Sequence, residues 1–431
     1  MRETNQKRIP LFHLMSRNLA LFMFAMVLAN ISGHMWMPLL PLYVQELGAD
    51  VPQVGLYFTL SSVLHLGFQI FGGWLSDSIG RLRAAAVGSL AGLAGMIVMI
   101  LSPSWQYLLI ASLFESISFA FIAPTYMAYI AEESSEESRG RVYGMAQAIF
   151  MVVGVIGPPL GGMLSDRFSF RSMLLYATGL YVIATLFRLW MSRLDRMKAK
   201  ANGTDTKPSF GKLKKDLATM AGLILAGGLI TWILIVDGIT DIVYRMSFEL
   251  QPLYMENLMG LSKTQIGWLT SISSLITILC ITPSGWLADK KGERVGILLG
   301  ILFYSAGMGV FVLAGKFLGF LVSWLLFGIG NALLSPSYDS LISKAVPEKI
   351  RGTAFGLFST SISFISLPAP YLGAQLWKHV NPRAPFIAPI LASLPVLPII
   401  WLKFKAPSRP ADPEGDDITD QGAATELTTK I

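Results

Sequence analysis

The sequence predicts an all-α membrane protein in which twelve transmembrane helices form two pseudo-symmetric six-helix bundles. Of its 431 residues, 53% are hydrophobic and only 14% are charged, whereas about a quarter of the residues in a soluble domain are charged. Apolar runs close to the ~20 residues that cross a bilayer core recur along the whole chain. The two halves of the chain also match each other, which predicts two similar bundles.

The first predicted span follows a basic segment that resembles the start of a signal peptide. Its apolar run exceeds the roughly 7–15 residues of a signal peptide's apolar region and leads into further spans, so we interpret it as a retained helix. The single cysteine, Cys280, excludes an intrachain disulfide. The twelve predicted spans cover residues 19–43, 53–75, 84–101, 105–131, 141–165, 171–191, 217–250, 264–287, 295–315, 317–344, 352–376 and 382–404.

The distribution of positive charge predicts the orientation of these spans. Most of the 34 lysines and arginines fall on the termini and the even-numbered loops, which by the positive-inside rule makes both termini cytoplasmic. The same bias accounts for the net charge of +7 without a nucleic-acid partner. We therefore expect a multi-pass protein of the plasma (inner) membrane that is surrounded by the lipid bilayer and is a monomer.

A polar, basic stretch divides the chain into two halves. We expect an N-terminal bundle at 1–192, a cytoplasmic linker at 193–216, a C-terminal bundle at 217–405 and a disordered cytoplasmic tail at 406–431. A shift of 212 residues superimposes identical residues of the halves, among them Gly55 on Gly267, Asp77 on Asp289, Pro124 on Pro336 and Pro158 on Pro370. Paired bundles of this kind are typical of transporters, whose substrate site lies near mid-membrane between the repeats.

One motif follows the second predicted span and recurs after the eighth. The first copy, GGWLSDSIGRLR at 72–83, contains Gly73, Asp77, Gly80, Arg81 and Arg83. The second copy, GWLADKKGER at 285–294, keeps Asp289 and Gly292 but has Glu293 where the first has Arg81. Here the chain resembles the major facilitator superfamily, whose signature is Gly-x-Leu-x-Asp-x-x-Gly-Arg. The resemblance covers essentially all twelve spans and implies a secondary transporter that works by alternating access.

The resemblance also implies a cytoplasmic gate. Asp77, at a membrane edge, is suited to accept hydrogen bonds from the open N-terminus of a helix in the other half, and membership of the family implies that such contacts close the gate in the outward-facing state. A solvated turn whose charges only fix the topology is the alternative. Arg139 and Arg351, which superimpose in the repeat, complete the expected gate residues.

The fifth predicted span contains the sequence GVIGPPLGG. Its glycines and prolines permit close helix packing and a kink, and the residues concerned are Gly154, Gly157, Pro158, Gly161 and Gly162. The pattern resembles an element of the proton-driven drug antiporters of the superfamily, which favours export. Its repeat copy, APYLG at 369–373, keeps Pro370 and Gly373, so a packing role alone is the alternative.

A stripe of charge interrupts the seventh predicted span at intervals of four residues, at Asp237, Asp241, Arg245 and Glu249. Residues four apart share one face of a helix. An offset of 211 matches Asn30 with Asp241 and His34 with Arg245, which places both pairs near mid-membrane. We expect Arg245 to reach Asp241 and Glu249, which leaves Asp237 without its own cation.

A carboxylate without a cation is suited to bind and release a proton, so Asp237 is the first candidate for proton coupling. Glu115 is the second for the same reason, because it is the only ionisable side chain in its span before Glu132. The arginine that drug antiporters carry in the fourth span is missing between Arg83 and Arg139, so their usual proton relay is not carried over. A structural alternative stays open for each site. Asp241 and Arg245 either contact the substrate or form a static ion pair that holds the helix. Glu115 either takes part in proton coupling or is bonded to Ser112 or Ser116 of its own helix.

Motifs of other chemistry are missing from the sequence. It has no P-loop, no Cys/His cluster with metal-site spacing and no dinucleotide-binding pattern, so we expect no enzyme, metal or cofactor. The expected function is proton-coupled efflux of a small amphiphilic organic solute by a secondary active transporter. Proton-coupled uptake of a metabolite or nutrient, and a non-transporting receptor or assembly factor of the same fold, are the alternatives.

Overall fold

The computed structural model describes residues 16–199, 229–346 and 351–404, and every regular element within these ranges is a helix. The all-helical fold class is therefore confirmed. The helices of the first half are α1 (Arg17–Trp36), η2 (Met37–Leu39), α2 (Leu40–Glu46), α3 (Val51–Ile79), α4 (Arg81–Leu101), η3 (Trp105–Tyr107), α5 (Leu108–Glu133), α6 (Arg139–Arg167) and α7 (Phe170–Ala199). Those of the second half are α9 (Leu229–Phe248), α10 (Gln251–Asn257), α11 (Lys263–Lys291), α12 (Glu293–Leu313), α13 (Phe317–Ala345), α14 (Arg351–Ile365), α15 (Ala369–His379) and α16 (Ala384–Lys403).

The internal repeat recurs in the bounds of the helices. A shift of 212 residues carries α3 onto α11 and α4 onto α12, and a shift of 211 carries α2 onto α10. In both halves a single glycine forms the turn between the long helices, and Gly80 and Gly292 have φ angles of 86° and 89°. Glycine is the residue that adopts such angles without strain, so the tight turns predicted at both places are confirmed.

Nine helical segments of the described residues are long and apolar enough to cross a membrane. The other three predicted spans correspond to α3, to α9 and to the pair α14 and α15. Two spans differ from the single helices that were expected. The first is interrupted by η2, which contains Pro38, and the eleventh by the turn that ends at Pro368, because proline lacks the N–H that continues a helix.

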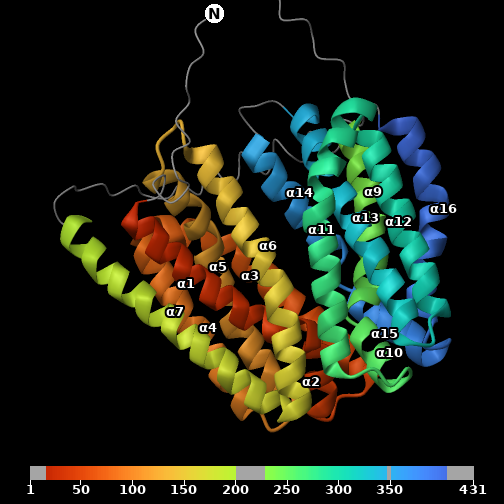
Figure 1. Ribbon diagram of the computed structural model, residues 1–431, viewed down its shortest axis with the longest axis horizontal. Helices are drawn as coiled ribbons and strands as arrows, with labels where there is room; N and C mark the ends of the chain where they lie inside the picture. The colour runs from red at the N-terminus through yellow and green to blue at the C-terminus, as the bar shows by residue number, and fades with distance from the viewer. Residues whose placement is uncertain (1–15, 200–228, 347–350, 405–431) are drawn as a thin grey trace, which may run out of the picture.

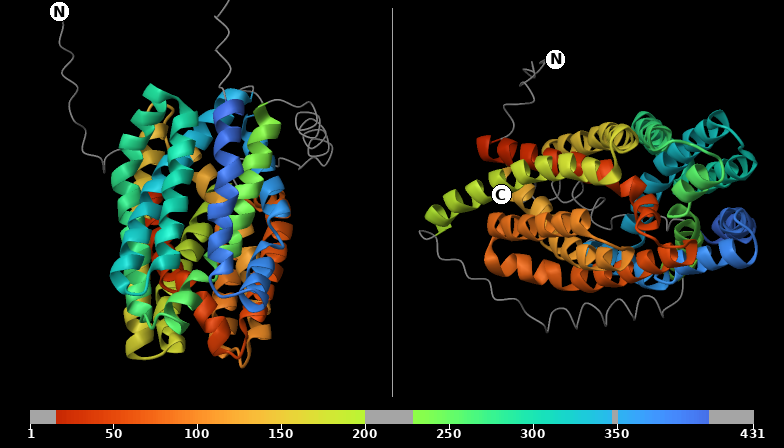
Figure 2. Two further views of the ribbon diagram at one scale, coloured as in Figure 1. Left: turned by 90° about the vertical axis from the view of Figure 1, so that its right-hand side faces the viewer. Right: turned by 90° about the horizontal axis from the view of Figure 1, so that it is seen from below.

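The helices form two bundles that meet along two long contacts. In the first bundle α1 packs on α6 and α7, and in the second α12 packs on α13 and α16. Between the bundles, α6 packs on α11 and α3 packs on α15. Seen from below, the helices up to α7 lie mainly on one side and those from α9 onward mainly on the other (Figure 2).

The bundles approach each other most closely at the end that holds α2 and α10, at the bottom of Figure 1. Toward the opposite end, where α1 begins and α16 finishes, the ribbons of α6 and α11 diverge. We call these ends the α2/α10 end and the opposite end.

The predicted segments between and after the bundles are mostly outside the described residues. Helix α7 continues to Ala199, past the expected end of the sixth span at 191 and into the linker expected at 193–216. The rest of that linker, residues 217–228 of the seventh predicted span and the tail at 406–431 lie outside the described ranges.

Candidate functional site

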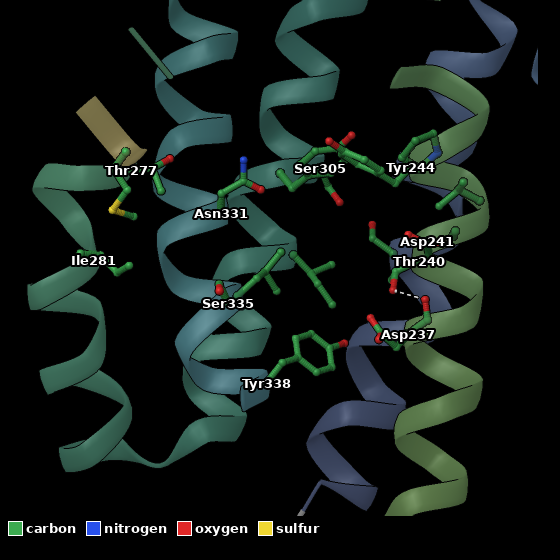
Figure 3. Close-up of a pocket in the computed structure, with 18 residues that line it drawn as sticks. Asp237, Thr240, Asp241, Tyr244, Thr277, Ile281, Ser305, Asn331, Ser335 and Tyr338 are labelled. Carbon is green, nitrogen blue, oxygen red and sulfur yellow. Dashed lines mark hydrogen bonds between the residues drawn. The ribbon is translucent and has the colours of Figure 1, made fainter. Parts of the chain in front are cut away.

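A cavity of about 410 Å³ is lined by helices of the second bundle and, from the first bundle, by Met151 of α6. Its charged wall comes from α9, and the facing wall from α12 and α13 is rich in hydroxyl and amide groups (Figure 3). The labelled side chains of these walls are Asp237, Thr240, Asp241, Tyr244, Ser305, Asn331, Ser335 and Tyr338. A volume of this size is typical of sites for small molecules, and we call it the inner cavity.

A second cavity, of about 460 Å³, lies between the bundles. The first bundle lines it with residues of α1, η2 and α2, including His34, and the second bundle lines it with residues of α9 to α13, including Glu249. We call it the central cavity. The two cavities are neighbours, because both are lined by Tyr244, Thr277, Tyr304 and Asn331.

The acidic residues on α9 and directly after it divide between the two cavities. Asp237 and Asp241 line the inner cavity and Glu249 lines the central cavity. The Nε atom of Arg245 donates a hydrogen bond of 2.8 Å to Oδ2 of Asp241, as expected from their spacing. The expected second contact is wrong, because Arg245 forms no ion pair with Glu249 in the described structure.

Asp237 is the carboxylate that the stripe leaves without a cation. Within the described ranges it forms no ion pair, and its carboxylate accepts no hydrogen bond; the bond drawn in Figure 3 runs from Oγ1 of Thr240 to the main-chain oxygen of Asp237. The hydroxyl of Tyr338 points toward Asp237 from α13 (Figure 3). The carboxylate of Asp237 therefore faces the inner cavity beside a neutral donor.

The matching pair on α1 differs in its chemistry. The Nδ2 atom of Asn30 donates to the main-chain oxygen of Met26 at 2.8 Å, and Nδ1 of His34 lies 2.9 Å from the main-chain oxygen of Asn30. His34 lines the central cavity, whereas Asn30 lines neither cavity. Both halves therefore have a polar pair at corresponding positions, Asn30 with His34 and Asp241 with Arg245. The ion pair is formed by the second of these.

Glu115 does not share a cavity with Asp237. It is not among the residues that line either cavity, and its Oε1 atom instead packs against Gly95 of α4, where an added Cβ would lie 3.1 Å away. The hydrogen bond expected from Ser116 is also not formed, because its hydroxyl donates to the main-chain oxygen of Ser112. The role of Glu115 in coupling stays a prediction.

The Gly-Pro element of α6 packs closely against α1 and α11 near the α2/α10 end. A Cβ on Gly161 would overlap the main-chain oxygen of Met35, and a Cβ on Gly157 would lie 2.5 Å from Cβ of His34. Gly154 is less crowded, at 3.6 Å from Ser274. Two further contacts cross to α11: a Cβ on Gly162 would overlap the main-chain oxygen of Lys263, and a Cβ on Gly267 would overlap that of Pro158.

The repeat copies make the same kind of contact. A Cβ on Gly373 would overlap the main-chain oxygen of Met246, and a Cβ on Gly55 would lie 2.7 Å from that of Pro370. Met35 and Met246 superimpose at the offset of 211. The packing role of the element is therefore observed in both halves, and by itself it carries no information on the direction of transport.

Polar contacts also join the bundles at the α2/α10 end. The main-chain N–H groups of Lys263 and Thr264, at the start of α11, donate to Asp166 of α6 at 3.1 and 2.7 Å. The Nζ atom of Lys263 lies 3.8 Å from carboxylate oxygens of both Glu46 and Glu256. Carboxylates are stabilised at a helix N-terminus by its free N–H groups and dipole.

Sequence analysis missed Asp166. It makes the kind of contact expected of Asp77, a carboxylate at the N-terminus of a helix in the other bundle, but at the other end of the molecule. A signal was present, because the triplet Leu164-Ser165-Asp166 repeats Leu75-Ser76-Asp77. Arg188 of α7 was also missed as a candidate; it is buried and donates to the neutral groups Ser89 and Met26.

The expected gate residues at the opposite end are described only in part. The surroundings of Gly73 and the side chains of Asp77 and Arg351 lie outside the described part of the structure, so the gate contact of Asp77 stays a prediction. Arg81 forms an ion pair of 3.2 Å with Glu132. Arg139 begins α6, and Arg83 and Asp289 are exposed.

Comparison with known proteins identifies relatives of the whole chain. A family model described as Major Facilitator Superfamily matches residues 22–249 and 238–427. The chain is 26% identical over 402 residues to the multi-drug resistance efflux pump PmrA homolog of Lactococcus lactis, covering 89% of this chain and 94% of the relative. It is 22% identical over 369 residues to a Na(+), Li(+), K(+)/H(+) antiporter of Planococcus maritimus, covering 79% and 85%.

A solved structure has the same fold. The crystal structure of a bacterial homologue of the iron transporter ferroportin in an inward-facing state superimposes with a TM-score of 0.73 and 14% sequence identity, over 90% of this chain and 99% of that chain. At this level of identity the similarity shows the fold alone.

Proposed function

The chain belongs to the major facilitator superfamily of membrane transporters, and on this premise we propose that it exports a small amphiphilic organic solute in exchange for protons. The observation that carries the proposal is the inner cavity. There Asp241 is paired with Arg245, while Asp237 has no ion-pair partner among the described residues. The chain is a transporter and not an enzyme.

Asp237 is the proposed coupling residue. An ionised side chain within a membrane costs several kcal/mol unless it is paired or hydrated, so such groups face cavities and mark ion or proton pathways. Asp241 has Arg245 as its counter-ion, whereas Asp237 gains a neutral state only by taking up a proton. Loading and unloading of that proton would change the charge of the inner cavity in each transport cycle.

The contacts at the α2/α10 end support alternating access. If the termini are cytoplasmic, as the positive charges predict, this end faces outside, and the glycine contacts and the Asp166 cap close the protein on that side. In this proposal the described state is inward-facing, and the outward-facing state requires α6 to separate from α11 and α3 from α15. The two contact pairs are equivalent in the repeat, so they can open together.

The names of two relatives support export by exchange. The Lactococcus lactis relative is named as a multi-drug resistance efflux pump homolog, and the Planococcus maritimus relative as an antiporter that uses H⁺. These names do not identify the solute of this chain. The proposal therefore takes from them only the direction and the exchange with protons.

Reconstitution into proteoliposomes tests the proposal. Vesicles with an acidic lumen, loaded with a pH-sensitive dye, should accumulate an exported amphiphilic solute from a panel of fluorescent dyes and metabolites, and each uptake should alkalinise the lumen. Solute movement in the same direction as the protons would show uptake by symport instead. Counterflow without any effect of the pH gradient would refute coupling, and a lack of counterflow for the whole panel would favour a receptor.

A further inference from the structure

The two cavities carry an excess of negative charge. Their acidic lining residues are Asp237, Asp241 and Glu249, and the described lining residues include no lysine or arginine. Arg245, which lies on the same helix, compensates Asp241 through the ion pair. Each cavity is therefore left with one carboxylate that forms no ion pair within the described ranges, Asp237 in the inner cavity and Glu249 in the central cavity.

Aromatic rings in mutual contact line the two cavities. Tyr244 and Tyr304, which line both cavities, have ring centroids 5.5 Å apart, and Tyr304 is 5.0 Å from Phe327. Phe327 is in turn 5.4 Å from Trp324, and both line the central cavity. The faces of aromatic rings attract cations electrostatically. Tyr338 adds a further ring on the wall that faces Asp237 (Figure 3).

We propose that the transported solute is a monovalent organic cation, bound in the inner cavity by Asp237 and the neighbouring tyrosines. The inference rests on the proposed function and adds the charge of the solute to it. An anion would find two carboxylates and no lysine or arginine among the described lining residues. A neutral solute would leave Asp237 without a counter-charge, whereas a cation supplies one.

The cavity fits an organic cation better than a metal ion. Hard cations such as Ca²⁺ take about six to eight oxygen ligands at close range. Among the described residues no group of three or more His, Cys, Asp or Glu side chains is arranged to hold a metal ion. The inner cavity of about 410 Å³, with aromatic and aliphatic walls, instead matches a bulky cation of delocalised or shielded charge.

The two unpaired carboxylates also define a path. The sequence separation of Asp237 and Glu249 corresponds to roughly 18 Å along a helix axis, at ~1.5 Å of rise per residue. A cation that moves between them passes Tyr244, Tyr304 and the amide of Asn331, which line both cavities. Because Asp237 cannot hold a proton and a cation as counter-charge at once, binding of either one displaces the other, which gives exchange.

Matched ions of opposite charge test this inference. Tetraphenylphosphonium and tetraphenylborate have the same shape and opposite charge, and benzyltrimethylammonium provides a smaller cation. With the purified full chain in nanodiscs at mildly alkaline pH, we expect saturable binding of both cations and no competition by tetraphenylborate. Lowering the pH should weaken the binding of the cations to the unmodified chain, because protons occupy the same carboxylate.

Variants locate the site. Asp237→Asn should weaken binding of tetraphenylphosphonium at least tenfold, and Asp237→Glu, which restores the charge, should recover most of it. Asp339→Asn provides the control, because Asp339 is an exposed acid of α13 that lines neither cavity. Equal loss of affinity in Asp339→Asn would mean that the effect is general and would overturn the assignment to Asp237.

The inference and the proposed function fail in different ways. Tetraphenylborate binding as tightly as the phosphonium ion, or no binding of either cation to the unmodified chain, would overturn the cationic solute even if a neutral solute is transported with protons. Cation binding that depends on Asp237, combined with no effect of a pH gradient on transport, would support the cationic solute and refute proton coupling.

Discussion

Glu293 of α12 and Lys344 of α13 form an ion pair that is the charge-reversed copy of the pair between Arg81 and Glu132 in the first bundle. The shift of 212 residues carries Arg81 onto Glu293 and Glu132 onto Lys344. Glu293 is buried and also accepts a hydrogen bond of 2.9 Å from Ser340. The departure from the family signature at Glu293 is therefore compensated by its partner, and the contact between the neighbouring helices is retained.

This pair predicts a charge-swap rescue. Glu293→Arg places a second cation beside Lys344 and should lower the free energy of unfolding by about 1–3 kcal/mol, less than the loss of a fully buried pair, because Lys344 is half exposed. The double variant Glu293→Arg with Lys344→Glu recreates the arrangement of the first bundle and should recover most of the loss. Thermal unfolding in detergent of the unmodified chain, Glu293→Arg, Lys344→Glu and the double variant measures the coupling, and additive losses would contradict it.

The pair of Asp241 and Arg245 should be coupled in the same way. Their side chains are 22% and 39% exposed, so each single neutralisation should cost about 1 kcal/mol of stability, below the ~3–5 kcal/mol of a fully buried pair. The double variant Asp241→Asn with Arg245→Gln should lose less than the sum of the single variants. If the Tm losses of the two single variants simply add in the double variant, the observed 2.8 Å contact contributes no stability.

Asp237→Asn should separate coupling from movement of the solute. The amide mimics the protonated carboxyl, so accumulation driven by a pH gradient should disappear. Exchange of solute at equal pH should persist, although with weaker binding if the solute is a cation. Retention of full pH-driven transport in the variant would place coupling elsewhere, with Glu115 as the next residue to substitute. Loss of both activities in a folded variant, even at saturating solute, would assign Asp237 to support of α9 and not to coupling.

Gly267→Ala should open the α2/α10 end. An added Cβ on Gly267 overlaps the main-chain oxygen of Pro158, and backbone cannot move aside as a flexible side chain does. The population should shift toward the state in which α6 and α11 are separated there, which spin-label distances between the two helices would report. Gly285→Ala on the same helix is the matched control, because no described atom lies within 4 Å of its added Cβ. Equal shifts in both variants would refute the steric explanation.

Contacts at the α2/α10 end should also depend on pH through Glu256 of α10. Burial raises the pKa of Glu256 above its ordinary value; the ammonium of Lys263 opposes this, and the charges of Asp166 and Glu46 raise it further. A carboxyl whose pKa is raised by the closed contact binds its proton more tightly there. The closed end should therefore be favoured at acidic pH and lose this stabilisation as pH rises through the raised pKa. Spin-label distances across this end should follow that trend, and Glu256→Gln should abolish it.

Much of the fold could be predicted from sequence because its signals are local or repeated. Apolar runs mark the spans, and the repeat fixes corresponding positions, so the turns at Gly80 and Gly292 were expected before their φ angles were seen. The pair of Asp241 and Arg245 was also expected, because residues four apart meet on any helix. These inferences need no knowledge of how distant helices pack.

Other parts of the site depend on contacts between distant helices. Asp166 meets Lys263 and Thr264 because α6 and α11 touch at the α2/α10 end, and neither the sequence nor the repeat indicates which end is in contact. The rotation of α5 about its own axis decides that Glu115 faces Gly95 and not the inner cavity. Glu249 was expected to reach Arg245, but the guanidinium turns toward Asp241.

The duplicated halves share the residues that pack at the α2/α10 end but not those that line the inner cavity. Gly55 and Gly267 make equivalent contacts, whereas the positions of Asp241 and Arg245 are occupied by Asn30 and His34 in the first half. On the proposal that the inner cavity binds the solute, mutations in the second half change which solute is recognised without altering the packing at the α2/α10 end. One architecture would then diversify in substrate during evolution while the contacts between its bundles are inherited unchanged.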